Sequence, residues 1–393
     1  MKPVRLVTAV LTAAALSLSL ATPVAAAPGH GHGPPHHPGH PKYAKPGTLR
    51  WAAPDGLVIG TAVAGGGHHE EQDYPDPFTS DRKYRKILAD QFSSVSPENQ
   101  MKWEYIHPEQ GEYDFAMADS IVEFAERNRQ DVRGHTLLWH SQNPEWLEEG
   151  DFSEEELREI LHDHITTVVG RYAGRIDQWD VSNEIFDEEG ELRTEENIWI
   201  RELGPQIIAD AFRWAHEADP SAELYFNDYN VEDVNAKSDA YYELVQELLA
   251  DGVPVHGFSA QVHLSTQYGF PASLEENLQR FDDLGLGTAL TEVDVRMRLP
   301  ESGKPTRAQL EQQADYYQQA LSACLNVEGC ASFTIWGFTD KYSWVPVFFE
   351  GEGAATVMDE KFRTKPAFST LKHTLLKADR KGPGRPPWAG PRG

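Results

Sequence analysis

The chain has 393 residues, of which 40% are hydrophobic and 25% are charged, and its formal net charge is −27. This composition is that of an ordinary soluble globular protein, and it excludes collagen-like, coiled-coil and generally disordered chains. Nucleic acid and anionic membranes repel so acidic a chain, which argues against both as partners. A neutral or weakly charged ligand is easier to reconcile with this charge.

Residues 1–26 have the pattern of a signal peptide. Lys2 and Arg5 form a basic start, an apolar stretch covers residues 6–21, and Val24–Ala26 is a small-residue cleavage site. A membrane anchor is the alternative, but the apolar stretch is short for one. We therefore predict a secreted, extracellular protein. Removing the signal would change the formal net charge from −27 to −29.

Two segments lack the apolar side chains needed to form a core. Residues 27–47 are rich in His, Pro and Gly, and residues 378–393 are rich in Pro, Gly and basic residues. Both are predicted to be disordered, the first as a linker and the second as a tail. The folded domain is expected to cover residues 48–377.

Within residues 48–377, short apolar runs alternate with amphipathic segments. The predicted strands are Leu57–Val63, Phe92–Ser96, Val132–Leu138, Gln178–Ser182, Leu224–Asn227, Gly257–Val262, Thr288–Glu292 and Ser332–Trp336. Helical patterns between them include Glu154–Tyr172, Asn235–Ala250 and Thr306–Leu325. This alternation predicts an α/β fold, a single (β/α)8 TIM barrel, with a doubly wound open sheet as the alternative.

Local signals add detail to two parts of this fold. Three capping boxes are expected at helix starts, formed by Ser153 with Glu156, Ser273 with Glu276, and Thr306 with Gln309. Cys324 and Cys330 are predicted to form a disulfide, because export permits one. In the chain-entropy model so short a loop contributes about 2 kcal/mol.

Polar side chains cluster where the predicted strands end. Glu184 closes the run that begins at Gln178, and Glu292 closes the run that begins at Thr288. A barrel brings all of its strand ends to one face, where the active site lies. Two facing carboxyl groups there are what cleavage of a glycosidic bond needs. A solvated strand-end charge is the alternative for either one alone.

An ordered set of motifs then identifies a family resemblance. The motifs are Asn99–Trp103 (NQMKW), Arg133–Gln142 (RGHTLLWHSQ), Trp179–Glu184 (WDVSNE), Tyr225–Asn230 (YFNDYN), Gln261–His263 (QVH), Thr291–Asp294 (TEVD) and Trp336–Trp344 (WGFTDKYSW). Together they resemble the endo-β-1,4-xylanases of glycoside hydrolase family 10. The resemblance extends from about residue 57 to residue 376.

The resemblance implies a retaining double-displacement reaction, with Glu184 as general acid/base and Glu292 as nucleophile. It implies that sugar is bound on the glycone side by Glu98, Asn99 and Lys102. It also implies further substrate-binding residues around the sugar being cleaved: His135, Trp139, Asn183, Tyr229, Gln261, His263, Trp336 and Trp344.

Physical chemistry gives some of these roles a reason. A hydrogen bond from His263 would keep Glu292 ionised. Glu184 must begin protonated, and the charge of Glu292 is expected to raise its pKa. Trp179, His140 and His164 are assigned structural roles.

The sequence departs from the family pattern in a few places. Ser182 stands where an aliphatic residue is usual, and Asn143 where Leu is common. Residues 65–77 form an extended loop in which His68 and His69 suggest a metal site. A solvated loop is the favoured interpretation, because loops on this face vary freely. No metal and no cofactor are predicted.

The predicted partners are xylan and xylo-oligosaccharides, with the protein acting as a monomer. Two alternatives stay open. One is a β-1,4-glucanase on the same scaffold, and the other is a non-catalytic glycan-binding protein.

Overall fold

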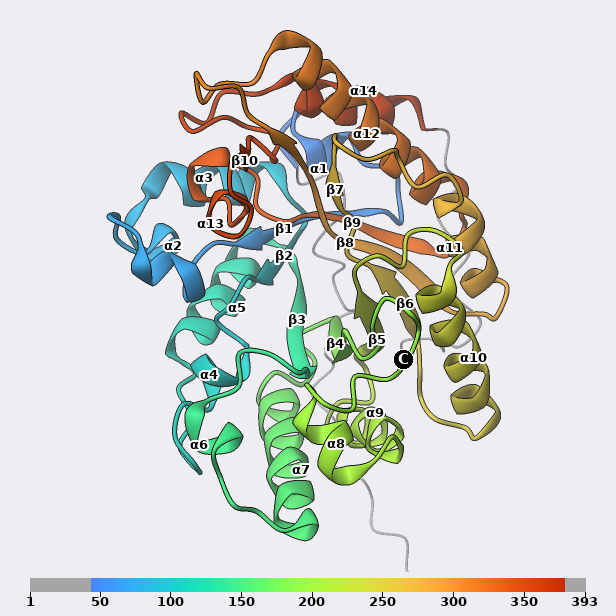
Figure 1. Ribbon diagram of the computed structural model, residues 1–393. Coiled ribbons are helices and arrows are strands. Elements are labelled where there is room, and N and C mark those ends of the chain that lie inside the picture. The colour runs from blue at the N-terminus through green and yellow to red at the C-terminus, as the bar shows by residue number, and fades with distance from the viewer. Residues whose placement is uncertain (1–43, 379–393) are drawn as a thin grey trace, which may run out of the picture. The chain divides into compact units, whose positions relative to one another are not determined.

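The computed structural model describes residues 44–378, which form a closed barrel of parallel strands surrounded by helices (Figure 1). The barrel strands are β1 (Val58–Val63), β2 (Ser94–Pro97), β3 (Asp131–Leu138), β4 (Gln178–Asn183), β5 (Glu223–Asp228), β6 (Gly257–Ala260), β8 (Gly287–Arg298) and β9 (Cys330–Ile335). Neighbouring strands pair in parallel, and the pairings of β9 with both β1 and β8 close the ring. The predicted (β/α)8 barrel is confirmed.

Two short strands were not predicted, and both pair with the part of β8 that continues beyond the barrel. β7 (His263–Ser265) pairs in parallel with β8, and β10 (Glu352–Gly353) pairs antiparallel with it. The strand predicted to end at Val262 ends two residues earlier, at Ala260. Val262 has a φ of 67°, which interrupts the extended backbone. Gln261 therefore lies after the end of β6, and His263 begins the separate strand β7.

The longer helices cover the outside of the barrel, and shorter helices lie in the connecting loops (Figure 1). They are α1 (Leu49–Ala52), α2 (Pro77–Ser80), α3 (Arg82–Gln91), α4 (Trp103–Ile106), α5 (Ala116–Asn128), α6 (Glu145–Glu148), α7 (Glu154–Arg171), α8 (Ile198–Leu203), α9 (Gln206–Ala218), α10 (Ala236–Ala250), α11 (Leu274–Asp282), α12 (Arg307–Asn326), α13 (Val345–Phe348) and α14 (Pro366–Lys377), with 3₁₀ turns η2 (Gly67–Glu71) and η3 (Asp340–Tyr342). The three helices that were given bounds from the sequence match α7, α10 and α12 to within a residue at each end.

Two of the three predicted capping boxes are present, at Ser153 of α7 and Thr306 of α12. The box predicted at Ser273 is wrong. Its hydroxyl donates to Asp233 at 2.8 Å and accepts from the backbone N–H of Val234 at 2.9 Å, so it joins two loops instead of capping α11. A capping box that was not predicted begins α10, where Asn235 accepts from the backbone N–H of Ser238.

The core lies inside the barrel and between the strands and helices. Trp179, assigned a structural role, is fully buried on β4. A Cβ atom at Gly134 on β3 would lie 2.3 Å from its ring, so this position needs glycine. Within the barrel, Arg133 donates to Asp180 and, at 2.9 Å, to Ser259. The pairing satisfies charges that would be costly to bury alone.

The predicted disulfide is present and joins Cys324 at the end of α12 to Cys330 at the start of β9. Across residues 44–378, every helix is too short or too polar to cross a membrane. The signal peptide, nearly all of the 27–47 segment and the tail beyond residue 378 lie outside the described residues, so those predictions remain predictions.

Candidate active site

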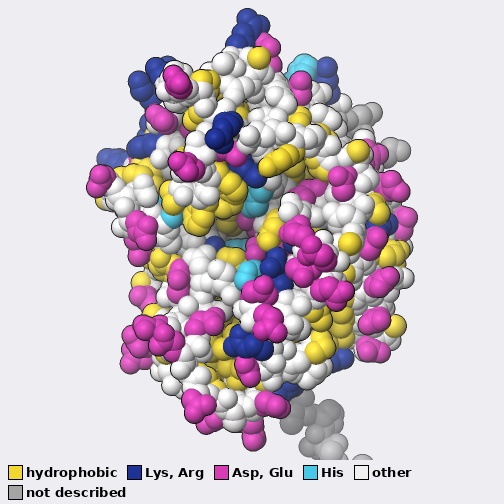
Figure 2. Space-filling model, in the orientation of Figure 1, with side chains coloured by type: hydrophobic (Ala, Val, Ile, Leu, Met, Phe, Trp, Pro, Cys, Tyr) yellow, Lys and Arg dark blue, Asp and Glu magenta, His cyan; other side chains and the backbone are white. Residues whose placement is uncertain are grey.

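The carboxyl ends of the barrel strands surround a cleft of about 540 Å³, which Figure 2 shows as a hollow in the face of the molecule. This volume is typical of a small-molecule site. The predicted site residues that line it are Glu98, Asn99, Lys102, His135, Trp139, Glu184, Tyr229, Gln261, His263, Glu292, Trp336 and Trp344. Residues that are far apart in the sequence therefore line the same cleft.

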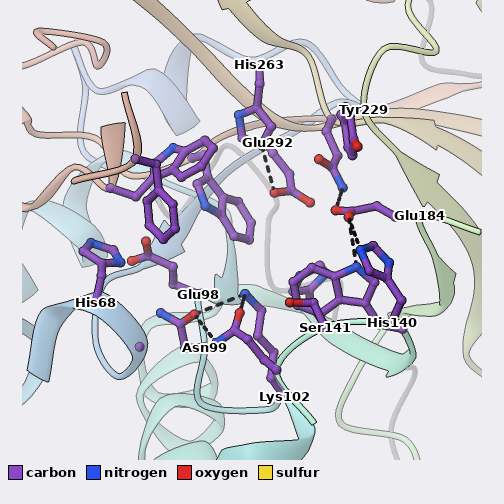
Figure 3. Close-up of a pocket in the computed structure, with 18 of the residues that line it drawn as sticks. His68, Glu98, Asn99, Lys102, His140, Ser141, Glu184, Tyr229, His263 and Glu292 are labelled. Carbon is purple, nitrogen blue, oxygen red and sulfur yellow. Dashed lines mark hydrogen bonds and ion pairs between the residues drawn. The ribbon is translucent and has the colours of Figure 1, made fainter. Parts of the chain in front are cut away.

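Glu184 follows directly after β4 and has a φ of 54°, an uncommon conformation for a residue other than glycine. Such backbone strain persists only where the surroundings enforce it. Here the backbone N–H of Glu184 donates to the carbonyl of Asn227 at 3.0 Å, and Tyr241 accepts from the N–H of Ile185 at 3.2 Å. These contacts turn the Glu184 side chain into the cleft (Figure 3).

The carboxylate of Glu184 accepts three hydrogen bonds. Gln261 donates to Oε1 at 2.9 Å, Asn183 donates to Oε1 at 3.2 Å, and Trp139 donates to Oε2 at 2.9 Å. Burial alone would raise the pKa of Glu184, but Gln261, His140 and Trp139 lower it on balance. The expected rise is therefore wrong for the free protein, because these neighbours stabilise the ionised form.

Glu292 lies on β8 and shares the cleft with Glu184 (Figure 3). Its Oε1 accepts a hydrogen bond from Asn227 at 2.8 Å, and its Oε2 lies 3.3 Å from Nε2 of His263. The other ring nitrogen of His263 lies 3.1 Å from Asp294, and Trp344 also donates to that aspartate at 2.7 Å.

His263 is held in its charged form by this arrangement. Burial would lower its pKa, but Asp294 and Glu292 outweigh burial and raise it to about 10. His263 is thus a cation at neutral pH, and its Nε2 makes the expected contact with the carboxyl group of Glu292.

Asn227 joins the two halves of the site from β5. Its Nδ2 donates both to Glu292 and to Oδ1 of Asn183 at 2.9 Å, while Thr291 donates to its Oδ1 at 2.6 Å. Asn183 is fully buried behind the cleft surface, where it contacts Glu184. Direct contact between Asn183 and a sugar therefore stays a prediction.

Glu98, Asn99 and Lys102 form a second polar group beyond Glu292 (Figure 3). Nζ of Lys102 donates to Asn99 at 3.1 Å and to Gln142 at 2.7 Å, and it lies 4.8 Å from the centre of the Trp139 ring. Burial lowers the pKa of Lys102, although the charges of Glu292 and Glu98 oppose that change. Several donors and acceptors therefore face the cleft together.

Aromatic side chains cover the same space. Trp336 lies edge-on to His135 with 5.5 Å between ring centres, and Trp344 lies 4.9 Å from the His263 ring. His135 is itself oriented by Asp180, which lies 3.0 Å from its Nδ1. Apolar ring faces beside hydrogen-bonding groups suit a ligand that has both C–H surfaces and hydroxyl groups.

Several cleft residues were missed from the sequence or assigned differently. His140, assigned a structural role, lines the cleft with Nε2 4.0 Å from Glu184. His164 is structural as expected, buried in a stack against Trp103. Other cleft residues that were not predicted are Gly67, His68, Ser141, Gln142, Asn230, Arg296, Phe348 and Phe349. Two of these, Ser141 and Gln142, lie within the Arg133–Gln142 motif, which was a usable signal.

The loop at residues 65–77 is less exposed than expected. His69 is only 3% exposed and its Nε2 lies 2.8 Å from Glu98, whereas Glu70 and Glu71 of the same turn are exposed. Burial would raise the pKa of Glu98, but His69 lowers it on balance. One side of the loop is thus part of the cleft wall, and the expectation of a solvated loop holds only for its other side.

Comparison with known proteins agrees with this geometry. Residues 50–374 match the model of Glycosyl hydrolase family 10. The chain is 42% identical over 293 residues to endo-1,4-beta-xylanase B of Thermotoga neapolitana, covering 75% of this chain and 83% of that one. It is 40% identical over 280 residues to an endo-1,4-beta-xylanase of Agaricus bisporus, covering 71% of this chain and 82% of that one.

Solved structures give the same result. Xylanase 10B from Thermotoga maritima superposes with a TM-score of 0.78 at 40% identity, covering 84% of this chain and 98% of that one. Xylanase 10B from Thermotoga petrophila, solved with xylobiose, superposes with a TM-score of 0.76 at 41% identity, covering 82% and 94%. The chain belongs to glycosyl hydrolase family 10.

Proposed function

We propose that this protein is an endo-1,4-β-xylanase that hydrolyses internal bonds of xylan with retention of anomeric configuration. The observation that carries the proposal is the pair of carboxyl groups, Glu184 and Glu292, held in one cleft by separate hydrogen-bond networks. The relative from Thermotoga neapolitana is a xylanase, and the one from Thermotoga petrophila was solved with xylobiose.

In the first step, Glu292 attacks the anomeric carbon while Glu184 donates its proton to the departing glycosidic oxygen. The C–O bond to the leaving chain breaks as the bond to Glu292 forms. In the second step, Glu184 removes a proton from water, which attacks the anomeric carbon and releases Glu292. Retaining enzymes need the two carboxyl groups about 5–5.5 Å apart.

Glu184 must be protonated when the first step begins, although its hydrogen bonds lower its pKa in the free protein. We expect bound sugar to raise that pKa. A sugar in the cleft displaces water from around the carboxyl group, and loss of water disfavours the charged form. The leaving oxygen also accepts the proton of the neutral form.

The polar side chains on the glycone side of the cleft suit the binding of a neutral sugar. Glu98, Asn99, Lys102 and Gln142 offer donors and acceptors to hydroxyl groups, while Trp336 and Trp344 cover the ring. Xylan and xylo-oligosaccharides are the proposed ligands. We further propose that the protein acts outside the cell as a monomer, since residues 1–26 resemble an export signal and one chain supplies the whole cleft.

The roles of the two glutamates are tested by azide rescue with proton NMR of the product. Glu292→Ala should lose activity and regain it with azide, giving a product of inverted configuration. Glu184→Ala should still react with substrates that have good leaving groups, and azide should give a retained product. Swapped stereochemistry in the two variants would reverse the assignment, and initial release of the α-anomer by the intact enzyme would contradict the retaining mechanism.

Substrate choice is tested separately by product analysis on xylan and on soluble cellulose. The proposal predicts xylo-oligosaccharides of several lengths early in the reaction, and much slower release of sugar from cellulose. Equal rates on both polymers would favour the β-1,4-glucanase alternative. Binding of both polymers without any new reducing ends would favour a glycan-binding protein.

A further inference from the structure

The glycone end of the cleft contains a group of residues that the proposed reaction does not use. His68 and His69 lie in η2, next to Glu98 at the end of β2. One ligand atom from each of the three residues lies within 4.8 Å of the others. His68 lines the cleft beside Glu98 (Figure 3).

These three side chains are a chemically suitable ligand set for a transition metal. Two imidazoles and one carboxylate are ligands that zinc accepts, with bonds of about 2.0–2.2 Å. Nε2 of His69 is already 2.8 Å from Oε2 of Glu98. Two ligands of a tetrahedral zinc ion lie about 3.4 Å apart, so the ring of His68 must move inward by up to about 1.4 Å, which a rotation of its side chain can supply.

The surroundings contain the outer contact that a metal-bound histidine needs. Nδ1 of His69 lies 2.9 Å from the hydroxyl of Tyr74, which fixes the orientation of the ring. Histidine ligands usually donate their second ring N–H to such a partner. When a metal cation binds Nε2 of His69, that nitrogen loses its proton, while Nδ1 stays protonated and donates to the hydroxyl of Tyr74.

His68 provides a second, independent observation. Its Nε2 atom is buried and has no hydrogen-bond partner within the described part of the chain. A buried ring nitrogen without a partner costs free energy, and natural proteins rarely leave one. The ring lies edge-on to that of Phe348, which also lines the cleft, with 5.9 Å between the ring centres.

We propose that His68, His69 and Glu98 form an inhibitory site for a divalent transition metal such as Zn²⁺ at the glycone end of the cleft. The ion completes its coordination with water from the cleft. It occupies the carboxylate that the proposed function assigns to sugar binding, so metal and sugar exclude each other. The competition with sugar rests on the proposed function, whereas the metal site itself does not.

Calorimetric titration of the full-length protein with Zn²⁺ tests the site directly. The intact protein and His162→Ala, which alters an exposed histidine of α7, should show the same isotherm. His68→Ala should lose one binding event. Any binding to His30, His32, His36, His37 and His40 is common to all three proteins and cancels in the comparison. An unchanged isotherm in His68→Ala would overturn the proposal.

The competition is measured by titrating xylobiose with and without Zn²⁺. At a zinc concentration about nine times its own Kd, the apparent Kd of xylobiose should rise about tenfold in the intact protein. In His68→Ala the ratio of the two values should stay near one. Equal zinc effects in both proteins would refute the exclusion of sugar by metal. If xylobiose fails to bind even without zinc, the proposed function fails, and the zinc isotherm still decides the site.

Discussion

The two glutamates that we propose to be catalytic show how neighbouring side chains give identical carboxyl groups different environments. Glu184 is surrounded by neutral donors, of which Gln261 lowers its pKa most. Glu292 instead faces the charged ring of His263, which Asp294 supports from behind. The difference matches the division of labour between an acid/base and a nucleophile, because a nucleophile must be ionised to attack.

Replacing Gln261 with Leu should raise the pKa of Glu184, because the variant loses a donor to the carboxylate. Glu184 must be protonated to act as an acid, so the rate falls as pH rises through its pKa. The alkaline limb of kcat/KM, which reports the free enzyme, should therefore move to higher pH by about one unit. A pH profile on an aryl xylobioside measures the shift. An unmoved limb would mean that Gln261 does not control the proton.

At the scale of elements, several of the helices that surround the barrel begin where side chains satisfy their first backbone N–H groups. Asn235 does this for α10, and Ser153 and Thr306 do it for α7 and α12. Such contacts are local, and these three residues are not among those that line the cleft. They therefore affect stability without touching the chemistry.

Asn235→Ala should lower the free energy of unfolding by about 1 kcal/mol, the usual cost of losing an N-cap. Asn235 also donates to the carbonyl of Asn230 at 2.8 Å, so the loss should not fall below that value. Urea unfolding followed by tryptophan fluorescence measures the loss. Asn235→Ser is the matched control, since serine retains the capping oxygen and should recover most of the stability.

The disulfide between α12 and β9 gives a second test at this scale. Replacing Cys324 and Cys330 together with Ala should lower the free energy of unfolding by about 2 kcal/mol, because the closed loop is short. Cys330 is at the amino end of β9, opposite the cleft, so kcat and KM should not change. Urea unfolding measures the loss of stability, and steady-state kinetics measure kcat and KM. A large fall in kcat would contradict the separation of stability from catalysis.

At the scale of the whole molecule, charge is distributed unevenly. Acidic side chains are spread over the face that Figure 2 shows, whereas the basic side chains of Lys102 and His263 lie inside the cleft.

Two neutral histidines lie deeper in the protein. Nδ1 of His107 is 3.2 Å from Nδ1 of His164, and Nε2 of His107 accepts from the N–H of Gly111.

This buried pair predicts loss of stability in acid. Burial lowers the pKa of His107 to about 4 and that of His164 well below its ordinary value of 6.5. The unfolded chain thus binds more protons than the folded one below pH 6.5. Unfolding free energy should fall as pH drops from about 6.5 toward 4, by about 1.4 kcal/mol per unit of pKa difference. Urea unfolding across this range measures the slope.

His164→Phe is the comparison for that experiment. Phenylalanine keeps an aromatic ring stacked on Trp103 but cannot bind a proton. The variant should start less stable at pH 7, because His107 loses a partner, yet it should lose less stability on acidification. An unchanged slope would place the acid sensitivity elsewhere in the chain.

The sequence by itself determined the alternation of strands and helices and the composition of the rim. Parallel strands buried on both faces read as apolar runs, and the polar residues that follow each run favoured a barrel with Glu184 and Glu292 at one face over a doubly wound open sheet. Motifs such as Trp179–Glu184 carried the same information in order along the chain. These features are local, and local features are what a sequence displays.

Only the tertiary structure decided the contacts between rim residues. The reversed pKa shift of Glu184, the place of His140 beside it and the burial of His69 against Glu98 all depend on loops from different strands. Ser273 was misassigned for the same reason, since its partner Asp233 comes from another loop. Hydrogen bonds and burial between distant segments leave no periodic trace in a sequence, because they arise only once the barrel has closed.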